Sequence, residues 1–455
     1  MPEFTPKSLI DSRSAITNLI WLPLLARLAC FSRFTSTGLL MGWLILCATL
    51  TVQPGKALAN SAPDCNVATP TGNADSSTLY TYQFDSGARW SLCWHMEQSS
   101  GLNLTQVHYA APNEPMRQVL EQASLGQILF KYDEDTNYRH LLSDTGLGGT
   151  NTLDPGSSFC SDGELLNSTA EPNESICLKQ RDLNLMIQLR QETPIRRHQL
   201  SLHSWSSIDN FIYQTIWQLS EDGEILPVVE VSGQLARFTD DQRFGSPVGN
   251  ERFASNATFL FNWRMHFNID GDESRDIVEE IQFPFNVTNV VRRPFTSRVI
   301  ETETFRDVDR EQFRGWLISD SVTSSAIDST LDTRIGYYLD PQPSGFSYVS
   351  RRHNWALSDL AFTRSRSCEQ LASINIQNPD SVPACAGNLD FYTDGESLDG
   401  AQIVAWYSIA RHLTPDSEDF PAIGSLRAAF RLMPFDWSAQ TPFSSTEITP
   451  AGVAR

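Results

Sequence analysis

The chain has 455 residues, of which 40% are hydrophobic, 19% are charged and 10% are aromatic. This composition is typical of a globular protein and excludes a collagen-like, coiled-coil or wholly disordered chain. The formal net charge is −20 at pH 7, so the phosphate backbone of a nucleic acid is repelled on average and nucleic-acid binding is not expected.

Residues 1–59 carry the pattern of a secretory signal peptide. Arg33 precedes an uncharged stretch at residues 38–52, and the small-residue sequence Ala57-Leu58-Ala59 follows it. The stretch is shorter than the about 20 residues that span a bilayer. We therefore expect cleavage after Ala59 and a secreted or periplasmic location. An uncleaved membrane anchor is the alternative, which the earlier apolar run at residues 20–26 favours.

Six of the eight cysteines follow that segment and lie in three pairs of near neighbours. The pairs are Cys65 with Cys93, Cys160 with Cys177, and Cys368 with Cys385. An even number of cysteines in an exported chain indicates disulfides, and pairing of neighbours is the simplest connectivity. A zinc site is the competing interpretation, but the sequence has no Cys-x-x-Cys and no paired histidines nearby.

The remaining chain has the pattern of a β protein. A polar segment at residues 60–76 is expected to be a flexible start of the mature chain. After it, short runs alternate apolar and polar residues and are bounded by Gly, Asp, Asn and Pro, which is typical of strands. These runs are residues 78–84, 90–96, 104–110, 200–205, 212–219, 225–231, 258–269, 277–285, 334–339 and 403–409. Helical spacing is clearest at residues 116–130 and 358–371. We expect a mainly β domain over residues 77–445, one large antiparallel β-sandwich with few short helices, and a tail at 446–455.

Three stretches carry a family resemblance. They are NFIY at residues 210–213, FLFNWRMHFNIDGDES at 259–274 and IVAWYSIARHLTPDSEDFP at 403–421. In this order and at these distances they resemble the catalytic domain of copper amine oxidases, from about residue 80 to about residue 443. The resemblance implies the family's sandwich and its homodimer, and it supports pairing Cys160 with Cys177.

The family oxidises primary amines with topaquinone, a cofactor made from one of its own tyrosines with copper and dioxygen. That tyrosine lies in an Asn-Tyr-Asp/Glu sequence, and the matching position here is Phe211, between Asn210 and Ile212. Phenylalanine has no phenolic oxygen to ionise or to bind copper. The resemblance therefore implies that the ordinary route to topaquinone is closed.

The family's copper ligands are three histidines, two of them in a His-x-His pair on one strand, where alternate side chains share a face. Counting back from Arg264 by the family spacing places this pair at Ala257 and Phe259. The third position falls on Leu413, with His412 one residue early. Such an offset reverses the facing direction on a strand. We expect no metal and no cofactor, and copper with topaquinone is the alternative if the register differs.

Alignment to the same family pattern gives the positions that correspond to two further sites, a peripheral metal site and the catalytic base. A peripheral metal site that uses carboxylates in many members corresponds to His266, Asn268 and Gln402, none of which is a carboxylate. The aspartate that abstracts the substrate proton corresponds to Asp144, and Tyr132 corresponds to the tyrosine that hydrogen-bonds the quinone. A buried Asp144 beside apolar walls would have a raised pKa and could act as a base. A simple loop or turn role for Asp144 is the alternative.

These observations favour an exported protein that resembles copper amine oxidases, has lost the quinone and the copper, and binds a small amine or another protein. Whether it is an enzyme stays open. One alternative is repurposed chemistry with Asp144 as general acid or base near Tyr132 or Tyr213. Another is primary-amine oxidation to aldehyde, ammonia and hydrogen peroxide. Fold resemblance alone does not establish an activity.

Overall fold

The structure is a computed structural model of the chain, in which the described residues all belong to one compact unit within residues 57–455. It describes residues 63–65, 77–169, 171, 173–187, 195–249, 252–284, 294–324, 334–342, 344, 354–374, 387–438 and 441–443. The expected signal peptide, most of the 60–76 segment and the 446–455 tail lie outside these residues. No helix in the described part of the chain is both long and apolar enough to span a membrane.

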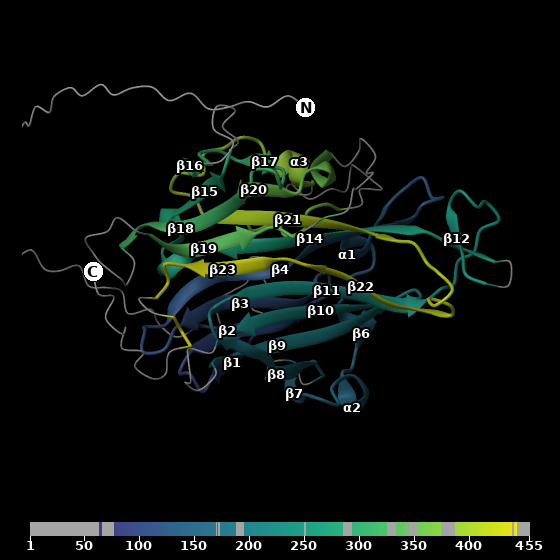
Figure 1. Cartoon of the computed structure of the whole chain (residues 1–455), viewed down its shortest axis with the longest axis horizontal. Coiled ribbons are helices and arrows are strands. Elements are labelled where there is room, and N and C mark those ends of the chain that lie inside the picture. The colour runs from purple at the N-terminus through teal and green to yellow at the C-terminus, as the bar shows by residue number, and fades with distance from the viewer. Residues whose placement is uncertain are drawn as a thin grey trace, which may run out of the picture. The chain divides into compact units, whose positions relative to one another are not determined.

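A nine-stranded sheet and a twelve-stranded sheet form most of this unit's described residues (Figure 1), and neighbouring strands pair in the antiparallel direction. The nine-stranded sheet has the order β1 (Thr78–Gln83), β2 (Arg89–Glu97), β3 (Gly101–Ala110), β4 (Arg117–Tyr132), β14 (Ala257–Phe267), β21 (Ile403–Leu413), β20 (Leu360–Arg364) and β17 (Thr304–Arg306), with β5 (Arg139–His140) paired to β4.

The twelve-stranded sheet has the order β16 (Thr296–Val299), β15 (Asp276–Gln282), β18 (Gly315–Ser324), β19 (Arg334–Asp340), β23 (Arg431–Phe435), β11 (Ile225–Gln234), β10 (Phe211–Ser220), β9 (Ile195–Ile208), β8 (Ser175–Ile187) and β7 (Glu164–Asn167). In addition, β22 (Ala422–Ala429) pairs with β11 and β6 (Thr152–Leu153) pairs with β9. A separate hairpin contains β12 (Gly245–Pro247) and β13 (Phe253–Ser255).

The helices of the described residues are single turns of three or four residues. They are α1 (Leu141–Asp144), α2 (Gly156–Phe159), α3 (Leu389–Tyr392) and the 3₁₀ helices η1 (Gly149–Asn151), η2 (Ile269–Gly271), η3 (Glu273–Arg275) and η4 (Asn354–Leu357). The prediction of a mainly β, antiparallel architecture with few short helices is confirmed.

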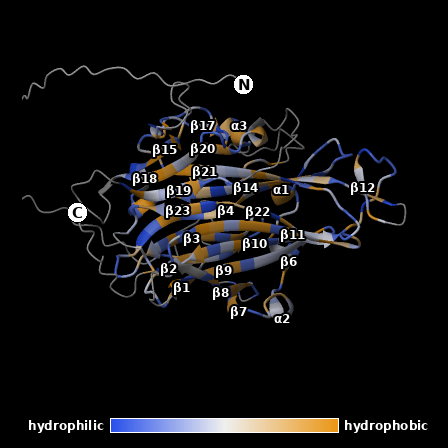
Figure 2. Cartoon of the chain, in the orientation of Figure 1, coloured by the Kyte–Doolittle hydropathy of each residue, from blue (hydrophilic) through white to orange (hydrophobic). Residues whose placement is uncertain are grey.

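The two sheets pack face to face around one hydrophobic core. Trp217 of β10 donates its indole N–H to the carbonyl oxygen of Leu102 in β3, at 3.3 Å. Trp90 of β2 donates in the other direction, to the carbonyl oxygen of Ser220 in β10, at 2.9 Å. Each indole therefore buries its apolar ring between the sheets and satisfies its one donor on the facing sheet. In Figure 2, hydrophobic residues, coloured orange, recur along the strands of both sheets.

A second, smaller core covers the outer face of the nine-stranded sheet. Leu129 of β4, Leu260 of β14 and Trp406 of β21 pack there against side chains that include Trp355 of η4 and Leu389 of α3. The central strands of this sheet are therefore buried on both faces, and all eleven residues of β14 are buried. Such strands lose the alternation of apolar and polar residues that exposed sheets show.

The helices expected at residues 116–130 and 358–371 are not found in the structure. Residues 116–130 form most of β4, which is buried on both faces: most of its apolar side chains pack in the sandwich core, and Leu129 packs in the outer core. Residues 358–371 contain only the short strand β20, followed by turns. Apolar residues spaced three and four apart occur in any segment that is buried all round, so periodicity alone does not separate a doubly covered strand from a helix.

Disulfides join Cys65 to Cys93 and Cys160 to Cys177, which are two of the pairs of near neighbours. The first ties the segment before β1 to β2, and the second ties the end of α2 to β8. Cys368 is also disulfide-bonded. Its expected partner, Cys385, lies outside the described residues.

Candidate functional site

The four residues that the resemblance puts at the cofactor and copper positions converge between the two sheets. Phe211 begins β10 and is 3% exposed, and Ala257 and Phe259 of β14 are fully buried. Leu413 ends β21, and its Cα pairs with that of Ala257 across the two strands. Because Ala257 and Phe259 are two residues apart on one strand, their side chains share the inner face.

Aromatic rings fill the space between these strands. The ring centroids of Phe211 and Phe259 are 5.7 Å apart, and Phe130 of β4 lies 5.6 Å from Phe211 and 4.8 Å from Phe259. We call Phe130, Phe211 and Phe259 the phenylalanine cluster. Phe211 meets Phe259 edge to face at 87°, an arrangement that aromatic quadrupoles favour.

This set of side chains does not fit copper or a precursor of topaquinone. Copper requires nitrogen, sulfur or oxygen donors, and imidazole suits it. The side chains of Phe211, Ala257, Phe259 and Leu413 are hydrocarbons and offer no donor atom. Their contacts are those of a packed core, which gains free energy by keeping water out.

His412 lies on the opposite face of β21 from Leu413, and its side chain is 47% exposed. Its Nε2 is 2.6 Å from Oδ2 of Asp133, and its Nδ1 is 3.1 Å from the Thr414 hydroxyl. The Thr258 hydroxyl donates to the other oxygen of Asp133 at 3.0 Å. His412 is therefore part of a polar cluster outside the sandwich and points away from the phenylalanine cluster.

Asp144 is exposed in the structure and does not lie between apolar walls. It ends the single-turn helix α1, and its Oδ2 accepts a hydrogen bond from the backbone N–H of His140, the N-cap, at 3.1 Å. The apolar residues of that turn, Leu141 and Leu142, are the ones that enter the core. A turn this short can bury only one side, and its carboxylate stays in water.

Tyr132 ends β4 next to the phenylalanine cluster, with its ring 5.1 Å from that of Phe130. The guanidinium of Arg237 lies 4.5 Å from the Tyr132 ring centroid. Burial raises the pKa of Tyr132, and the Arg237 charge opposes this rise. Tyr213 is fully buried two residues after Phe211, and burial raises its pKa as well. Both phenols therefore stay protonated near neutral pH.

The residues at the peripheral positions are also brought near one another. His266 Nδ1 is 3.5 Å from the Ser365 hydroxyl, and the backbone N–H of Ser365 donates to the carbonyl oxygen of Gln402 at 2.7 Å. Asn268 donates from Nδ2 to the Glu121 carboxylate at 3.2 Å. The bonds described thus involve the side chains of His266 and Asn268 and the main chain of Gln402, and no carboxylate stands at any of the three positions.

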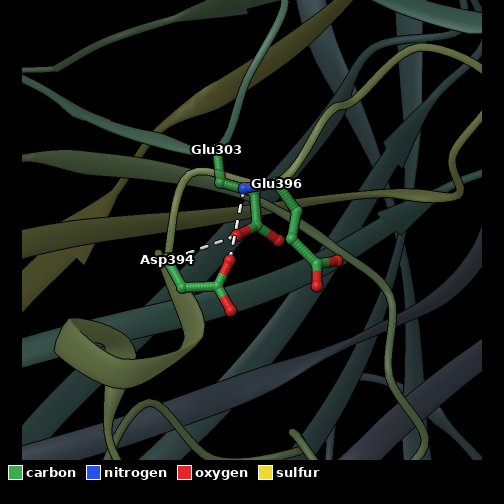
Figure 3. Close-up of side chains that lie close together, drawn as sticks. All are labelled: Glu303, Asp394 and Glu396. Atoms are coloured by element: carbon green, nitrogen blue, oxygen red, sulfur yellow. Dashed lines mark hydrogen bonds between the residues drawn. The ribbon is translucent and has the colours of Figure 1, made fainter.

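Close to that region lies a group of three carboxylates that no sequence motif predicts. Within the described ranges, only Glu303, Asp394 and Glu396 bring three metal-ligating atoms within 4.8 Å of one another. Figure 3 shows the three side chains and the backbone hydrogen bonds between them. Glu303 is buried, which raises its pKa, and accepts hydrogen bonds from the backbone N–H groups of Arg364 and Asp394.

Arginine already neutralises part of this group. Arg366 lies 2.8 Å from Glu396 and 3.7 Å from Asp394. Carboxylate oxygens suit a hard cation such as calcium rather than copper. The alternation of Asp394 and Glu396 was the only local signal, because Glu303 is far away in sequence.

Comparison with known proteins gives the family. The family profile described as "Copper amine oxidase, enzyme domain" matches residues 86–450. The chain belongs to the copper amine oxidase family. It is 22% identical over 435 residues to a primary amine oxidase from Arthrobacter sp. (strain P1), which covers 88% of this chain and 66% of the relative. It is 24% identical over 402 residues to a histamine oxidase from Arthrobacter globiformis, which covers 81% of this chain and 58% of the relative.

Solved structures of copper amine oxidases have the same fold. A copper-containing benzylamine oxidase from Hansenula polymorpha superposes with a TM-score of 0.65 at 17% identity, over 85% of this chain and 64% of that protein. A lysyl oxidase from Pichia pastoris gives a TM-score of 0.63 at 18% identity, over 78% of this chain and 52% of that protein. This copper amine oxidase family member therefore spans less than two thirds of the length of these relatives.

Proposed function

We propose that the protein is an exported, copper-free member of the copper amine oxidase family that acts by binding a small amine or another protein. The observation that carries the proposal is the content of the interior site. Phe211, Ala257, Phe259 and Leu413 lie close together on the three strands β10, β14 and β21. None of these side chains carries an atom that can bind a metal ion.

The substitutions support one another. A single missing histidine could be replaced as a copper ligand by a neighbour or by water. Here the four family positions carry neither the phenol that becomes topaquinone nor an imidazole that binds copper. The aromatic packing also supports the proposal, because Phe130, Phe211 and Phe259 fill the space with contacts of 4.8 to 5.7 Å between ring centroids.

Metal and quinone analysis tests the proposal directly. Purified protein is incubated with copper(II) in air, dialysed, and examined for bound copper by mass spectrometry and for quinone by redox-cycling stain. We expect no stoichiometric copper and no stain. Stoichiometric copper or a positive quinone stain overturns the proposal.

Primary-amine oxidation is the second candidate, and the relatives favour it, since the Arthrobacter proteins are a primary amine oxidase and a histamine oxidase. It requires a cofactor from residues other than those at the family positions. Hydrogen peroxide release from methylamine, histamine and benzylamine by copper-treated protein discriminates the candidates. Release above a heat-denatured control supports oxidation.

Repurposed chemistry at Asp144 is a third candidate that the same samples test. Asp144 is exposed and hydrogen-bonded to the start of α1. If an activity without peroxide release is detected, Asp144→Asn should abolish it under this candidate, and unchanged activity in the variant would contradict the candidate. We also propose the family's homodimer for this chain, for which sedimentation of the purified protein is the test.

A further inference from the structure

A cavity of about 350 Å³ opens where the ends of strands from the two sheets meet. The twelve-stranded sheet lines it with Ile277 and Val278 of β15 and Val299 of β16, and the nine-stranded sheet lines it with Ile403 of β21. The segments that follow β16 and precede β21 complete the lining with Ile300, Glu301, Ser397, Leu398 and Asp399.

This cavity is distinct from the phenylalanine cluster. The strand β21 begins at Ile403, which lines the cavity, and ends at Leu413, whose Cα pairs with that of Ala257 at the interior site. Eleven residues of strand at about 3.3 Å each put roughly 30 Å between these two ends. A ligand in the cavity therefore does not reach the positions that correspond to the cofactor and the copper.

The floor of the cavity is aliphatic. The lining residues that belong to the sandwich core, each at most 4% exposed, are Val278, Ile300, Leu398 and Ile403. Val299 is 41% exposed, so the apolar wall continues outward to water. Covering apolar surface of this kind is favourable, and the volume corresponds to on the order of ten water-sized groups. The cavity therefore fits a short hydrocarbon chain.

Two exposed acidic residues, Glu301 and Asp399, stand at the mouth of the cavity. The backbone N–H of Leu398 donates to the carbonyl oxygen of Glu301 at 2.8 Å, so the segments that carry the two acidic residues run side by side. Asp399 lies in a turn that is closed by a hydrogen bond from the Ala401 N–H to the Leu398 carbonyl oxygen at 3.2 Å. The turn places Leu398 in the core and leaves Asp399 in water.

The segments that meet at this mouth are negatively charged. Residues 299–303 contain two acidic residues, residues 394–399 contain three, and neither segment contains a basic residue. Arg364 and Arg366 neutralise part of this charge, at 3.6 Å and 2.8 Å from Glu396. Carboxylates that lie close together repel one another and attract a cation. An aliphatic floor below an anionic mouth complements a molecule with a hydrocarbon chain and a cationic head.

We propose that this cavity binds an alkylammonium ion with a chain of about six carbons. The chain lies on the aliphatic floor, and the charged nitrogen lies at the mouth beside Glu301 and Asp399. The inference rests on the proposed function only in giving its small amine a place. The cavity itself does not depend on the content of the interior site.

Saturation-transfer NMR with the hexyltrimethylammonium ion tests the inference on the mature protein. Its nitrogen carries three methyl groups, so it forms no Schiff base with a quinone and its binding does not report on a cofactor site. We expect a Kd of about 10 mM or lower at low salt. Hexanoate has the same chain length with the opposite charge, and tetramethylammonium has the same head without the chain. Each should bind at least about tenfold more weakly.

Two variants locate the bound ion. The double variant Glu301→Gln, Asp399→Asn removes the charge at the mouth and should raise the Kd about three- to tenfold at low salt. Val299→Lys places a positive charge in the wall of the cavity and should raise it more than tenfold. The three positions are exposed, so the variants keep the fold.

The matched control is the double variant Asp154→Asn, Glu418→Gln. It makes the same change in net charge at two exposed positions outside the lining and should leave the Kd unchanged.

Any of three results would overturn the inference. They are no saturation transfer to hexyltrimethylammonium, binding of hexanoate or tetramethylammonium with an equal Kd, and a Kd that Val299→Lys or the Glu301 and Asp399 double variant leaves unchanged. The copper assay succeeds or fails separately. Protein that holds copper and also binds hexyltrimethylammonium in this cavity contradicts the proposed function alone, and copper-free protein that does not bind it contradicts this inference alone.

Discussion

At the scale of single residues, Phe211 stabilises the sandwich through its contacts with Phe130 and Phe259. Truncation to alanine removes a fully packed ring between two sheets. Phe211→Ala should therefore lower the free energy of unfolding by about 3–5 kcal/mol, measured by urea denaturation. Phe391→Ala is the control, because Phe391 in α3 is 71% exposed, and it should change stability by less than about 0.5 kcal/mol. Equal losses in the two variants would contradict the packing described for the phenylalanine cluster.

The stability of the folded protein depends on pH through the carboxyl group of Glu369. Its side chain is 5% exposed, and burial raises its pKa from 4.5 to about 7, against the attraction of Arg366 at 3.4 Å. A carboxyl group with a raised folded-state pKa favours the folded protein when protonated. The stability that protonated Glu369 contributes to the folded protein is complete below pH 4.5 and is lost as the pH rises through about 7.

Replacing Glu369 tests this directly. Glu369→Gln mimics the protonated group at every pH, so the variant should be more stable than the wild type at pH 8, on the order of 1 to 2 kcal/mol, and equal to it at pH 4. Thermal unfolding at both pH values measures the difference. Glu418→Gln, at an exposed position after β21, is the control. A wild type that is the more stable protein at pH 8 would show that the ion pair with Arg366 outweighs burial.

At the scale of elements, the β10–β11 hairpin depends on Gly223. This residue has φ of +88°, and a Cβ there would lie 2.6 Å from Cε1 of Tyr109. Gly249 has a similar φ of +91° with no heavy atom within 4 Å of a built Cβ. Gly249→Ala should cost only backbone strain, about 1 kcal/mol, whereas Gly223→Ala should cost about 2 kcal/mol more because the Tyr109 ring must move. Chemical denaturation of both variants checks the difference, and equal costs would contradict the contact.

The sequence predicted elements well where one face of a strand is polar and poorly where both faces are covered. β1 and β10 alternate buried and less buried residues at their starts, and their runs were found. The spacing of β4 predicts a helix because residues on both faces of this strand pack against other parts of the chain. What covers the outer face is a layer around η4 and α3, more than 200 residues away in sequence, and no local window contains it.

At the scale of the whole molecule, the family resemblance predicts the architecture. It also predicts that Phe211, Ala257, Phe259 and Leu413 lie at one site, and in the structure they lie close together. It could not give features that depend on contacts between distant segments. Asp144 is exposed because its turn buries two leucines instead, and the carboxylates of Glu303 and Asp394 meet only through the fold.

Export and disulfide formation can be tested together on the secreted chain. We propose cleavage after Ala59, which removes Cys30 and Cys47 and leaves six cysteines. Disulfides form in oxidising compartments, and Cys65, Cys93, Cys160, Cys177 and Cys368 are all disulfide-bonded. Protein recovered outside the cytoplasm should therefore begin at Asn60 by terminal sequencing and take up no maleimide after denaturation without reductant. A chain that starts at Met1 in the membrane fraction would support the anchor instead, and one labelled thiol would contradict the pairing of Cys368 with Cys385.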